Sequence, residues 1–186
     1  APPKFFRVSE QKLRVQQRRV SRRKKFSRGH RNAKQLVAKT HEHIASQRMD
    51  FNHKLSAYLA KTYSLIAVED LCVKGLARTR LSKSVNDAGW SQLIQFISYK
   101  VENTGAKLVK IDRFFPSSRL CPACGLVNDK LTLSDREWDC ECGAHHDRDI
   151  NAANNILNCA LNSLGRSDGA LTYGNGQCVA PEAARP

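Results

Sequence analysis

The pattern of apolar and polar positions predicts two consecutive helices in the first third of the chain. Residues 9–28 contain good helix formers and no proline or glycine, so they predict a helix that ends near Gly29. From Asn32 to Thr62, residues at intervals of three or four would share one face of a helix, which predicts a second, longer helix. This face comprises Leu36, Thr40, Ile44, Gln47, Phe51, Leu55 and Leu59. Because residues 9–28 are too polar for a core, the pattern predicts an αα-hairpin with one exposed arm.

A short apolar run follows the predicted hairpin. Residues 65–68 are rich in β-forming side chains, and the run ends abruptly in Glu69 and Asp70. This pattern is typical of a buried strand that presents acidic side chains at its C-terminal end.

The next segment predicts a helix and a second strand. Residues 72–85 have the composition of a basic loop, and Asn86 or Asp87 can cap a helix that continues to Asn103. The sequence "KLVKID" at residues 107–112 then predicts a short strand. Strand, helix and strand at this spacing predict a βαβ unit with a parallel strand pair in an α/β sheet.

The C-terminal part predicts one more helix. It is expected to begin at Asp149 or Ile150 and to end at Leu164, with one side formed by Ala153, Leu157, Ala160 and Leu164. Residues 165–186 are rich in glycine, alanine, asparagine and proline without periodicity, which predicts a loose tail.

Charge changes the interpretation of the first helix. The chain has a net charge of +14, and residues 1–50 contain 15 basic and only 3 acidic side chains. A basic block of this density indicates a polyanionic partner such as DNA or RNA, although a solvated, like-charged helix is the simpler alternative. The expected nucleic-acid-binding residues are Arg18, Arg19, Arg22, Arg23, Lys24, Lys25 and Arg28. No 18-residue apolar run and no signal-peptide pattern is present, so we expect a cytoplasmic protein that makes no membrane contact.

Four of the seven cysteines form two close pairs. The segments "CPACG" and "CECG" contain Cys121 with Cys124 and Cys140 with Cys142. Two cysteine pairs that are each followed by glycine predict a zinc ribbon, in which each pair occupies a tight turn. Four thiolates close the coordination sphere, so this zinc ion is expected to be structural.

The short spacing of the second pair leaves the exact ligand set open. His145 or His146 could replace a poorly placed thiolate. Cys72, Cys159 and Cys178 have no partners at ligand spacing and are expected to be ordinary buried or tail cysteines.

Three carboxylates are candidates for a second metal site. Glu69 ends the first predicted strand, and Asp147 and Asp149 follow the cysteine region. Nucleases of the RNase H type hold divalent ions between such acids, and Mg²⁺ prefers oxygen ligands. Taken alone, each of these acids is more often a helix cap or a salt-bridge partner.

Several motifs, in order along the chain, resemble one known family. They are "LIAVEDLCVKGLARTR", "SVNDAGWSQLIQFISYK", "FFPSSRLCPACG", "LSDREWDCECG" and "HDRDINAANNIL". They are similar to the C-terminal half of the TnpB proteins of IS200/IS605-type insertion sequences, which are related to the type V CRISPR effectors (Cas12).

The resemblance implies roles for particular residues. Glu69 matches the second catalytic acid of a RuvC-like nuclease, and Asp149, in the D-x-N-A-A pattern, matches the third. Asp147 is the nearby alternative. The four cysteines match the family's zinc-binding insertion, and residues 7–60 match a helical insertion near the guide–target duplex.

This resemblance also implies an architecture. We expect an α/β chain with a partial RuvC-like (RNase H-type) fold, a long basic helical hairpin and an inserted zinc ribbon. The expected parts are the hairpin at 1–63, the RuvC-like βαβ part at 64–116, the ribbon at 117–146, a RuvC-like helix at 147–164 and the tail at 165–186.

The sequence departs from the family in one respect that bears on activity. The family's first catalytic acid lies on a G-x-D-x-G-like strand, and this chain is expected to begin just after that strand. The first hypothesis is therefore the C-terminal part of a Mg²⁺-dependent, RNA-guided DNA endonuclease, whose partners are DNA, a guide RNA from the transposon end and an N-terminal fragment. The alternatives are an inactive, truncated nucleic-acid-binding remnant and a zinc-ribbon module for protein contacts. Whether the chain is an enzyme stays open at this stage.

Overall fold

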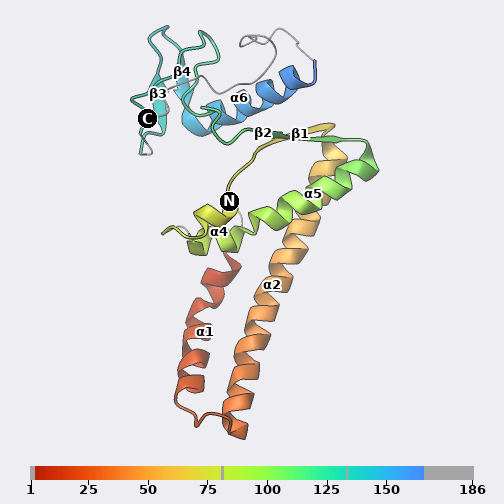
Figure 1. The fold of residues 1–186 in the computed structure, drawn as a ribbon, viewed down its shortest axis with the longest axis vertical. Helices are drawn as coiled ribbons and strands as arrows, with labels where there is room; N and C mark the ends of the chain where they lie inside the picture. The colour runs from red at the N-terminus through yellow and green to blue at the C-terminus, as the bar shows by residue number, and fades with distance from the viewer. Residues whose placement is uncertain (1–2, 81, 133, 166–186) are drawn as a thin grey trace. The chain divides into compact units, whose positions relative to one another are not determined.

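The fold was analysed in a computed structural model, which describes residues 3–80, 82–132 and 134–165. The elements in order are α1 (Phe5–Ser21), α2 (Arg28–Thr62), β1 (Leu65–Glu69), α3 (Val73–Leu76), α4 (Ser82–Ala88), α5 (Trp90–Thr104), β2 (Lys107–Ile111), β3 (Glu137–Asp139), β4 (His145–Asp147) and α6 (Arg148–Ser163) (Figure 1). The predicted α/β class is confirmed at this coarse level, since helices accompany two small sheets.

These elements form two compact units. The first contains the described residues up to Tyr63 together with Cys72–Ala106, and the second contains Ser64–Leu71 with the described residues from Lys107 onward. The first unit is therefore entirely helical, and both small sheets belong to the second.

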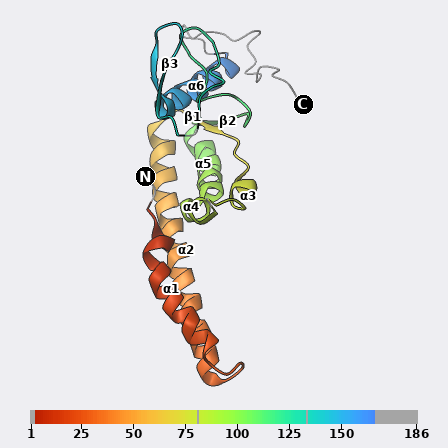
Figure 2. The ribbon, with the colours of Figure 1, turned by 90° about the vertical axis from the view of Figure 1, so that its left-hand side faces the viewer.

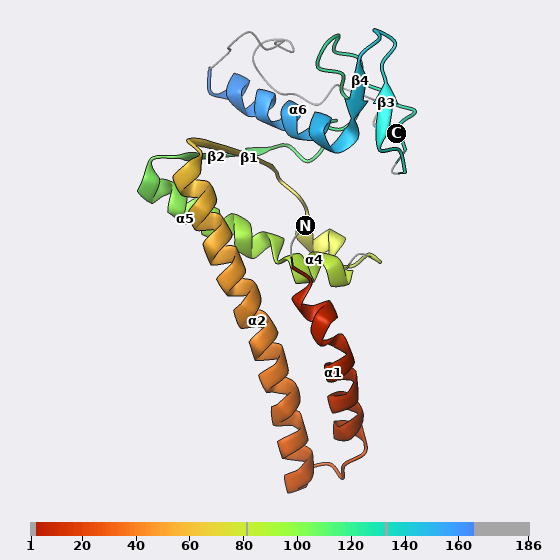
Figure 3. The same ribbon diagram turned by 180° about the vertical axis from the view of Figure 1, so that it is seen from behind.

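The first unit is built on the predicted helical hairpin. Helices α1 and α2 run side by side and are joined by a short turn, as Figures 2 and 3 show from two further directions. The turn falls at residues 22–27, and Gly29 lies within the first turn of α2, so the predicted boundary near Gly29 was wrong. The Ser27 hydroxyl accepts a hydrogen bond from the His30 backbone N–H, and this cap begins the second helix earlier than apolar periodicity alone indicated.

The buried face of α2 differs from the predicted one in its second half. Thr40 and Ile44 are buried as expected, but the buried positions farther along are Asn52, Ser56 and Ala60. Asn52 and Ser56 form hydrogen bonds with side chains of α5, which packs against α2, so polar contacts replace apolar ones along this part of the face. Neither α2 nor any other helix among the described residues combines the length and the apolar character needed to cross a membrane.

The structure also differs from the predicted basic loop and from the helix predicted after it. Within residues 72–85 the chain forms α3 and begins α4, and the helix predicted to run from Asn86 or Asp87 to Asn103 is interrupted at Gly89. Gly89 has a φ of +62°, and a Cβ atom there would lie 2.7 Å from Cδ of Arg48. The left-handed φ of Gly89 separates α4 from α5, and the Arg48 side chain leaves little room for a side chain at this position, which the local sequence does not reveal.

Asp87 connects three helices of the first unit. Its carboxylate is 4% exposed, accepts a hydrogen bond from the backbone N–H of Phe6 at 2.9 Å and lies 3.4 Å from the Arg48 guanidinium. Arg48 also donates to the Asp87 backbone oxygen at 2.9 Å. The carboxylate thus satisfies the free N–H groups at the start of α1 and pairs with the charge on α2.

Replacing Asp87 with alanine is expected to destabilise the first unit by about 3 kcal/mol. The substitution leaves Arg48 without its partner in a mostly buried place and removes the acceptor at the start of α1. Chemical denaturation followed by circular dichroism measures the change. Asp50→Ala is the matched control, because the Asp50–Lys54 pair is exposed; an equal loss in both variants would contradict the role of Asp87.

The second unit contains the predicted parallel strand pair. Strands β1 and β2 pair in parallel, with Leu65 opposite Lys107 and Glu69 opposite Ile111. Helix α6 packs against both strands. The core between them consists of Ile111, Cys159 and Ala160, with Leu65, Ala67, Val109, Phe115 and Ile156 packed around it.

The inward face of α6 is more polar than predicted. Ala160 is buried as expected, but Ala153 is exposed and Leu157 is 41% exposed. Asn151 and Asn155 are buried instead, at 4% and 3% exposure. The face was wrongly predicted because these asparagines bind backbone carbonyl groups inside the unit. Nearly all of the predicted tail, residues 166–186, lies outside the described residues.

Candidate metal centre and acidic residues

The two cysteine pairs lie on two tight turns of the second unit. The backbone N–H of Gly125 donates to the Cys121 oxygen at 2.8 Å, and Gly143 donates to the Cys140 oxygen at 2.8 Å. Both glycines have positive φ, 83° and 87°, which L-residues adopt at a cost. The glycine after each pair therefore closes a turn that directs the sulfurs to one place.

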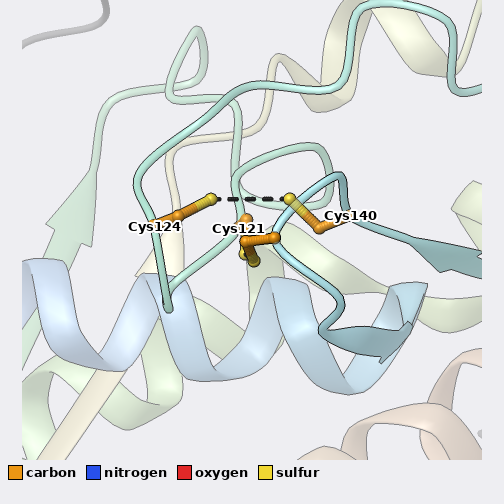
Figure 4. Close-up of side chains that lie close together, drawn as sticks. Cys121, Cys124 and Cys140 are labelled. Atoms are coloured by element: carbon orange, nitrogen blue, oxygen red, sulfur yellow. Dashed lines mark hydrogen bonds between the residues drawn. The ribbon is translucent and has the colours of Figure 1, made fainter.

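The four cysteine sulfurs converge as a metal site requires. Sγ of Cys121 lies 3.7 Å from Sγ of Cys142, and Sγ of Cys124 lies 3.4 Å from Sγ of Cys140. All four sulfurs lie within 4.8 Å of one another. Figure 4 shows the side chains of Cys124 and Cys140 pointing toward each other. A tetrahedral ion with metal–sulfur bonds of about 2.3 Å needs sulfurs about 3.8 Å apart. The cluster thus fits one tetrahedral ion, and no other group of three or more potential ligands within the described part of the chain gathers this closely.

The protonation behaviour of these thiols reflects their crowding. The backbone N–H of Ala144, together with hydrogen bonds from Cys124 and Cys140, lowers the pKa of Cys142 to about 7. The backbone N–H of Leu126 stabilises the Cys124 thiolate, but burial and the three neighbouring cysteines outweigh it and raise the pKa of Cys124 to about 12. Four thiolates cannot form together here without a cation to offset their charge.

The two histidines after the second pair have different surroundings. His145 Nδ1 lies 2.7 Å from an Asp139 oxygen, and this hydrogen bond, with the charge of Asp139, raises the pKa of His145. His146 Nε2 lies 3.2 Å from the Cys121 sulfur, and its ring lies 4.6 Å from that of Trp138. Because all four cysteines converge, neither histidine is needed as a fourth ligand.

The remaining cysteines lie apart from this cluster. Cys159 belongs to α6 and is buried, as predicted, in the core of the second unit. Cys72 is exposed, so the expectation of a buried or tail cysteine was wrong there, because Cys72 directly precedes the short surface helix α3. Cys178 lies outside the described residues.

Two of the three candidate acids lie on elements that pack together. Glu69 is the last residue of β1, and its Oε1 accepts a hydrogen bond from the Ser117 hydroxyl at 2.6 Å. Asp149 lies in the first turn of α6 with its side chain 74% exposed. Arg136 and Arg148 lie 3.6 and 3.5 Å from its carboxylate, so Asp149 is surrounded by positive charge.

The third candidate acid, Asp147, caps α6. Its Oδ1 accepts hydrogen bonds from the backbone N–H groups of Asp149 at 3.0 Å and Ile150 at 2.9 Å. An aspartate in this position satisfies two free donors at the helix start. The geometry therefore gives Asp147 a structural task that neither Glu69 nor Asp149 has.

Sequence reasoning missed a set of residues that links the acids to the metal site. The Asn155 amide donates to the backbone oxygens of Ser117 at 2.8 Å and Leu120 at 2.9 Å, and the Asn151 amide donates to Leu120 at 2.8 Å. Leu120 directly precedes Cys121, and Ser117 holds Glu69. The sequence feature that could have revealed these contacts is the pair of asparagines, Asn151 and Asn155, four residues apart on a helix that packs against a sheet.

The basic turn of the first unit presents its charges to solvent. Arg18 and Arg19 lie in the last turn of α1, the turn after it contains Arg22, Arg23, Lys24 and Lys25, and Arg28 begins α2. All seven predicted nucleic-acid-binding residues are exposed. Within the described residues none of the seven is ion-paired with a carboxylate, so their charges are available to a partner.

Comparison with known proteins places the chain among the proteins that its motifs resemble. The family model OrfB_IS605, described as a probable transposase, matches residues 1–80, and the Cas12f1-like TNB domain matches residues 90–156. A Streptomyces pristinaespiralis protein with the name "Putative RNA-guided DNA endonuclease" is 44% identical over 168 residues, which are 90% of this chain. The chain belongs to the TnpB family of insertion-sequence proteins. The predicted family membership is therefore confirmed.

Other TnpB relatives show how much of the family's length the chain covers. A relative in Escherichia coli K12, with the name "Putative RNA-guided DNA endonuclease InsQ", is 29% identical over 84% of this chain. Cas12f1 of Sulfoacidibacillus thermotolerans, a CRISPR-associated endodeoxyribonuclease, is 30% identical over 69% of it. The chain spans only 42% of the Streptomyces protein and 43% of InsQ. This TnpB-family chain thus corresponds to less than half of these relatives.

Proposed function

We propose that this chain is part of a transposon-encoded, RNA-guided DNA endonuclease and that it contributes two acids of a RuvC-like, Mg²⁺-dependent site. The observation that carries the proposal is the placement of Glu69 and Asp149. Glu69 ends β1, Asp149 lies in the first turn of α6, and α6 packs directly against β1 within one unit. Acids at a strand end and an adjacent helix start are typical of RNase H-type sites.

In this proposal Glu69 and Asp149 supply hard oxygen ligands. Mg²⁺ prefers such ligands, and when bound it would activate water and stabilise the leaving oxygen of a phosphodiester. The Ser117 hydroxyl holds one oxygen of Glu69 and thereby fixes the orientation of the carboxylate. Arg136 and Arg148 lie beside Asp149, and their positive charges favour its ionised, metal-binding form.

Asp147 is the weaker candidate for a ligand. One of its oxygens already accepts two backbone N–H groups at the start of α6. Asp147 therefore orients the helix turn that carries Asp149, and we assign it to positioning rather than to metal binding.

The cysteine cluster would hold zinc, and the basic turn would hold nucleic acid. Four thiolates at tetrahedral spacing prefer Zn²⁺ and leave no open position, so the ion would stabilise the ribbon only. The exposed cations of the turn would contact phosphates of the target DNA and of a guide RNA from the transposon end.

A cleavage assay with guide RNA and target DNA tests the nuclease proposal. We expect Mg²⁺-dependent cleavage only when residues 1–186 are supplemented with a segment that provides the family's first acid, because two carboxylates do not fix both ions. In the supplemented system, Glu69→Gln and Asp149→Asn should each reduce the cleavage rate by roughly 100-fold or more. Even the mutation of a residue that only hydrogen-bonds to a metal ligand typically reduces activity by about 10- to 100-fold.

Asp147→Asn is the matched control for Asp149→Asn. Asparagine caps helices about as well as aspartate, so this variant keeps α6 intact and removes only the charge. Retained cleavage in Asp147→Asn together with loss in Asp149→Asn supports the assignment. The reverse result would make Asp147 the ligand.

A second function is favoured by the basic turn alone. Seven exposed, unpaired cations can bind nucleic acid without any catalytic acid. If the supplemented system binds its target but does not cut it, the chain acts as a nucleic-acid-binding module.

A further inference from the structure

The turn between α1 and α2 contains a large exposed aromatic side chain. Phe26 is 86% exposed, and the Ser27 backbone N–H donates to the Lys24 oxygen at 3.1 Å, which closes a turn across Lys25 and Phe26. Figure 1 shows this turn at the end of the hairpin. The aromatic ring is therefore presented outward at the point where the helical hairpin reverses direction.

The backbone at Phe26 makes this residue a costly choice. Its φ is +65°, the left-handed region, and within the described residues Phe26 is the one non-glycine residue with positive φ. A turn whose third residue has positive φ favours glycine or asparagine. A bulky aromatic residue gains nothing from this backbone conformation.

Packing inside the molecule does not offset that cost. Among the described residues, none of the aromatic ring pairs includes Phe26, and its side chain is almost entirely in solvent. An exposed apolar ring on a strained backbone indicates a contact that forms with a partner.

The charges around Phe26 indicate the chemistry of that partner. Arg22, Arg23, Lys24, Lys25 and Arg28 are all exposed within four residues of it. Such cations bind phosphates, and an aromatic face among phosphate-binding groups is the combination that holds single-stranded nucleic acid. Bases inside a duplex are covered by their neighbours, so the ring can reach only an unpaired or terminal base.

We propose that Phe26 stacks on an exposed nucleobase while the surrounding cations hold the phosphates. This inference rests on the proposed nucleic-acid-binding role of the basic turn. It adds a base contact to the phosphate contacts and predicts a preference for unpaired nucleotides over continuous duplex.

The test uses residues 1–186 and oligonucleotides that contain 2-aminopurine, a fluorescent base that is quenched by stacking. Single-stranded DNA, single-stranded RNA and blunt duplex of equal length are titrated with the unaltered chain, Phe26→Gly and Phe26→Tyr. We expect quenching with the single strands, about tenfold weaker binding by Phe26→Gly and near-normal binding by Phe26→Tyr, because aromatic stacking is worth roughly this factor per base.

Two properties separate stacking from a general defect. Phe26→Gly removes no charge, so the dependence of affinity on salt should stay the same, and glycine relieves the positive φ, so thermal stability should not fall. Phe114→Gly is the matched control, because Phe114 is 77% exposed and lies in the other unit. It should bind like the unaltered chain.

The outcomes distinguish this inference from the function on which it rests. Salt-dependent binding by the unaltered chain with equal affinity and quenching in Phe26→Gly would overturn the stacking role alone. No salt-dependent binding by any form of the chain would overturn both proposals. Loss of binding to anionic lipid vesicles in Phe26→Gly, with nucleic-acid binding unchanged, would assign the ring to a membrane surface and also overturn the inference.

Discussion

Replacing Cys121 with serine is expected to abolish stoichiometric zinc binding and to unfold the ribbon around it. Cys121 is fully buried, and its sulfur lies within reach of Cys142 and His146. Structural zinc contributes about 10–16 kcal/mol of apparent binding free energy in small domains, which is folding free energy when the ribbon has little other core. Metal content after gel filtration and the NMR signal of the Trp138 indole measure the two effects.

Cys72→Ser provides the control for this experiment. Cys72 is exposed and belongs to the other unit, so its replacement should leave the zinc content unchanged. If Cys121→Ser still binds one zinc ion as tightly as the unaltered chain, the four-cysteine site is wrong, and a histidine such as His146 becomes the natural fourth ligand.

Binding of nucleic acid to the unaltered chain is expected to weaken steeply with salt. If most of the seven exposed cations contact phosphates, affinity should fall by about 10³- to 10⁵-fold between 50 and 200 mM salt, because each contact releases counterions. Replacing Arg22 and Arg23 together with glutamine should lower the slope of log affinity against log salt by about 2. Fluorescence anisotropy with a labelled oligonucleotide at several salt concentrations measures the slope.

Lys54 and Lys61, toward the opposite end of α2, provide the control for the double variant of Arg22 and Arg23. Both are exposed, and replacing them with glutamine removes the same charge from the same unit. A slope that changes equally in the two double variants would mean that the basic turn is not the principal contact surface.

Some parts of the fold follow from local sequence. The two long helices, both parallel strands and the helix after the cysteines are present where periodicity and composition predicted them. Their boundaries were less predictable: α1 ends at Ser21 and α2 starts at Arg28, because Ser27 caps the second helix. Likewise, Gly89 divides the predicted helix into α4 and α5 through its left-handed φ, and Arg48 of a distant helix occupies the space a side chain would need there.

The candidate sites also combine features that local sequence predicts with features that it does not. Cysteine spacing predicted the metal cluster, because each pair needs only its own local turn to present its sulfurs. The hydrogen bonds from Asn151 and Asn155 to the segment before Cys121 were not predictable, since they join residues more than 30 positions apart. The roles of Glu69 and Asp149 stay predictions, as does the division of the chain into functional domains.

By itself, the sequence determined the family, the concentration of positive charge near the first turn and the set of cysteines that can share an ion. These properties reside in residue identity and short spacing, which folding does not alter. Only the tertiary structure decided that Asp147 caps α6 while Asp149 stays exposed, that asparagines form the buried face of that helix, and that Phe26 projects from a strained turn. Each of these depends on which distant backbone groups come close or stay away, and that proximity is created by packing.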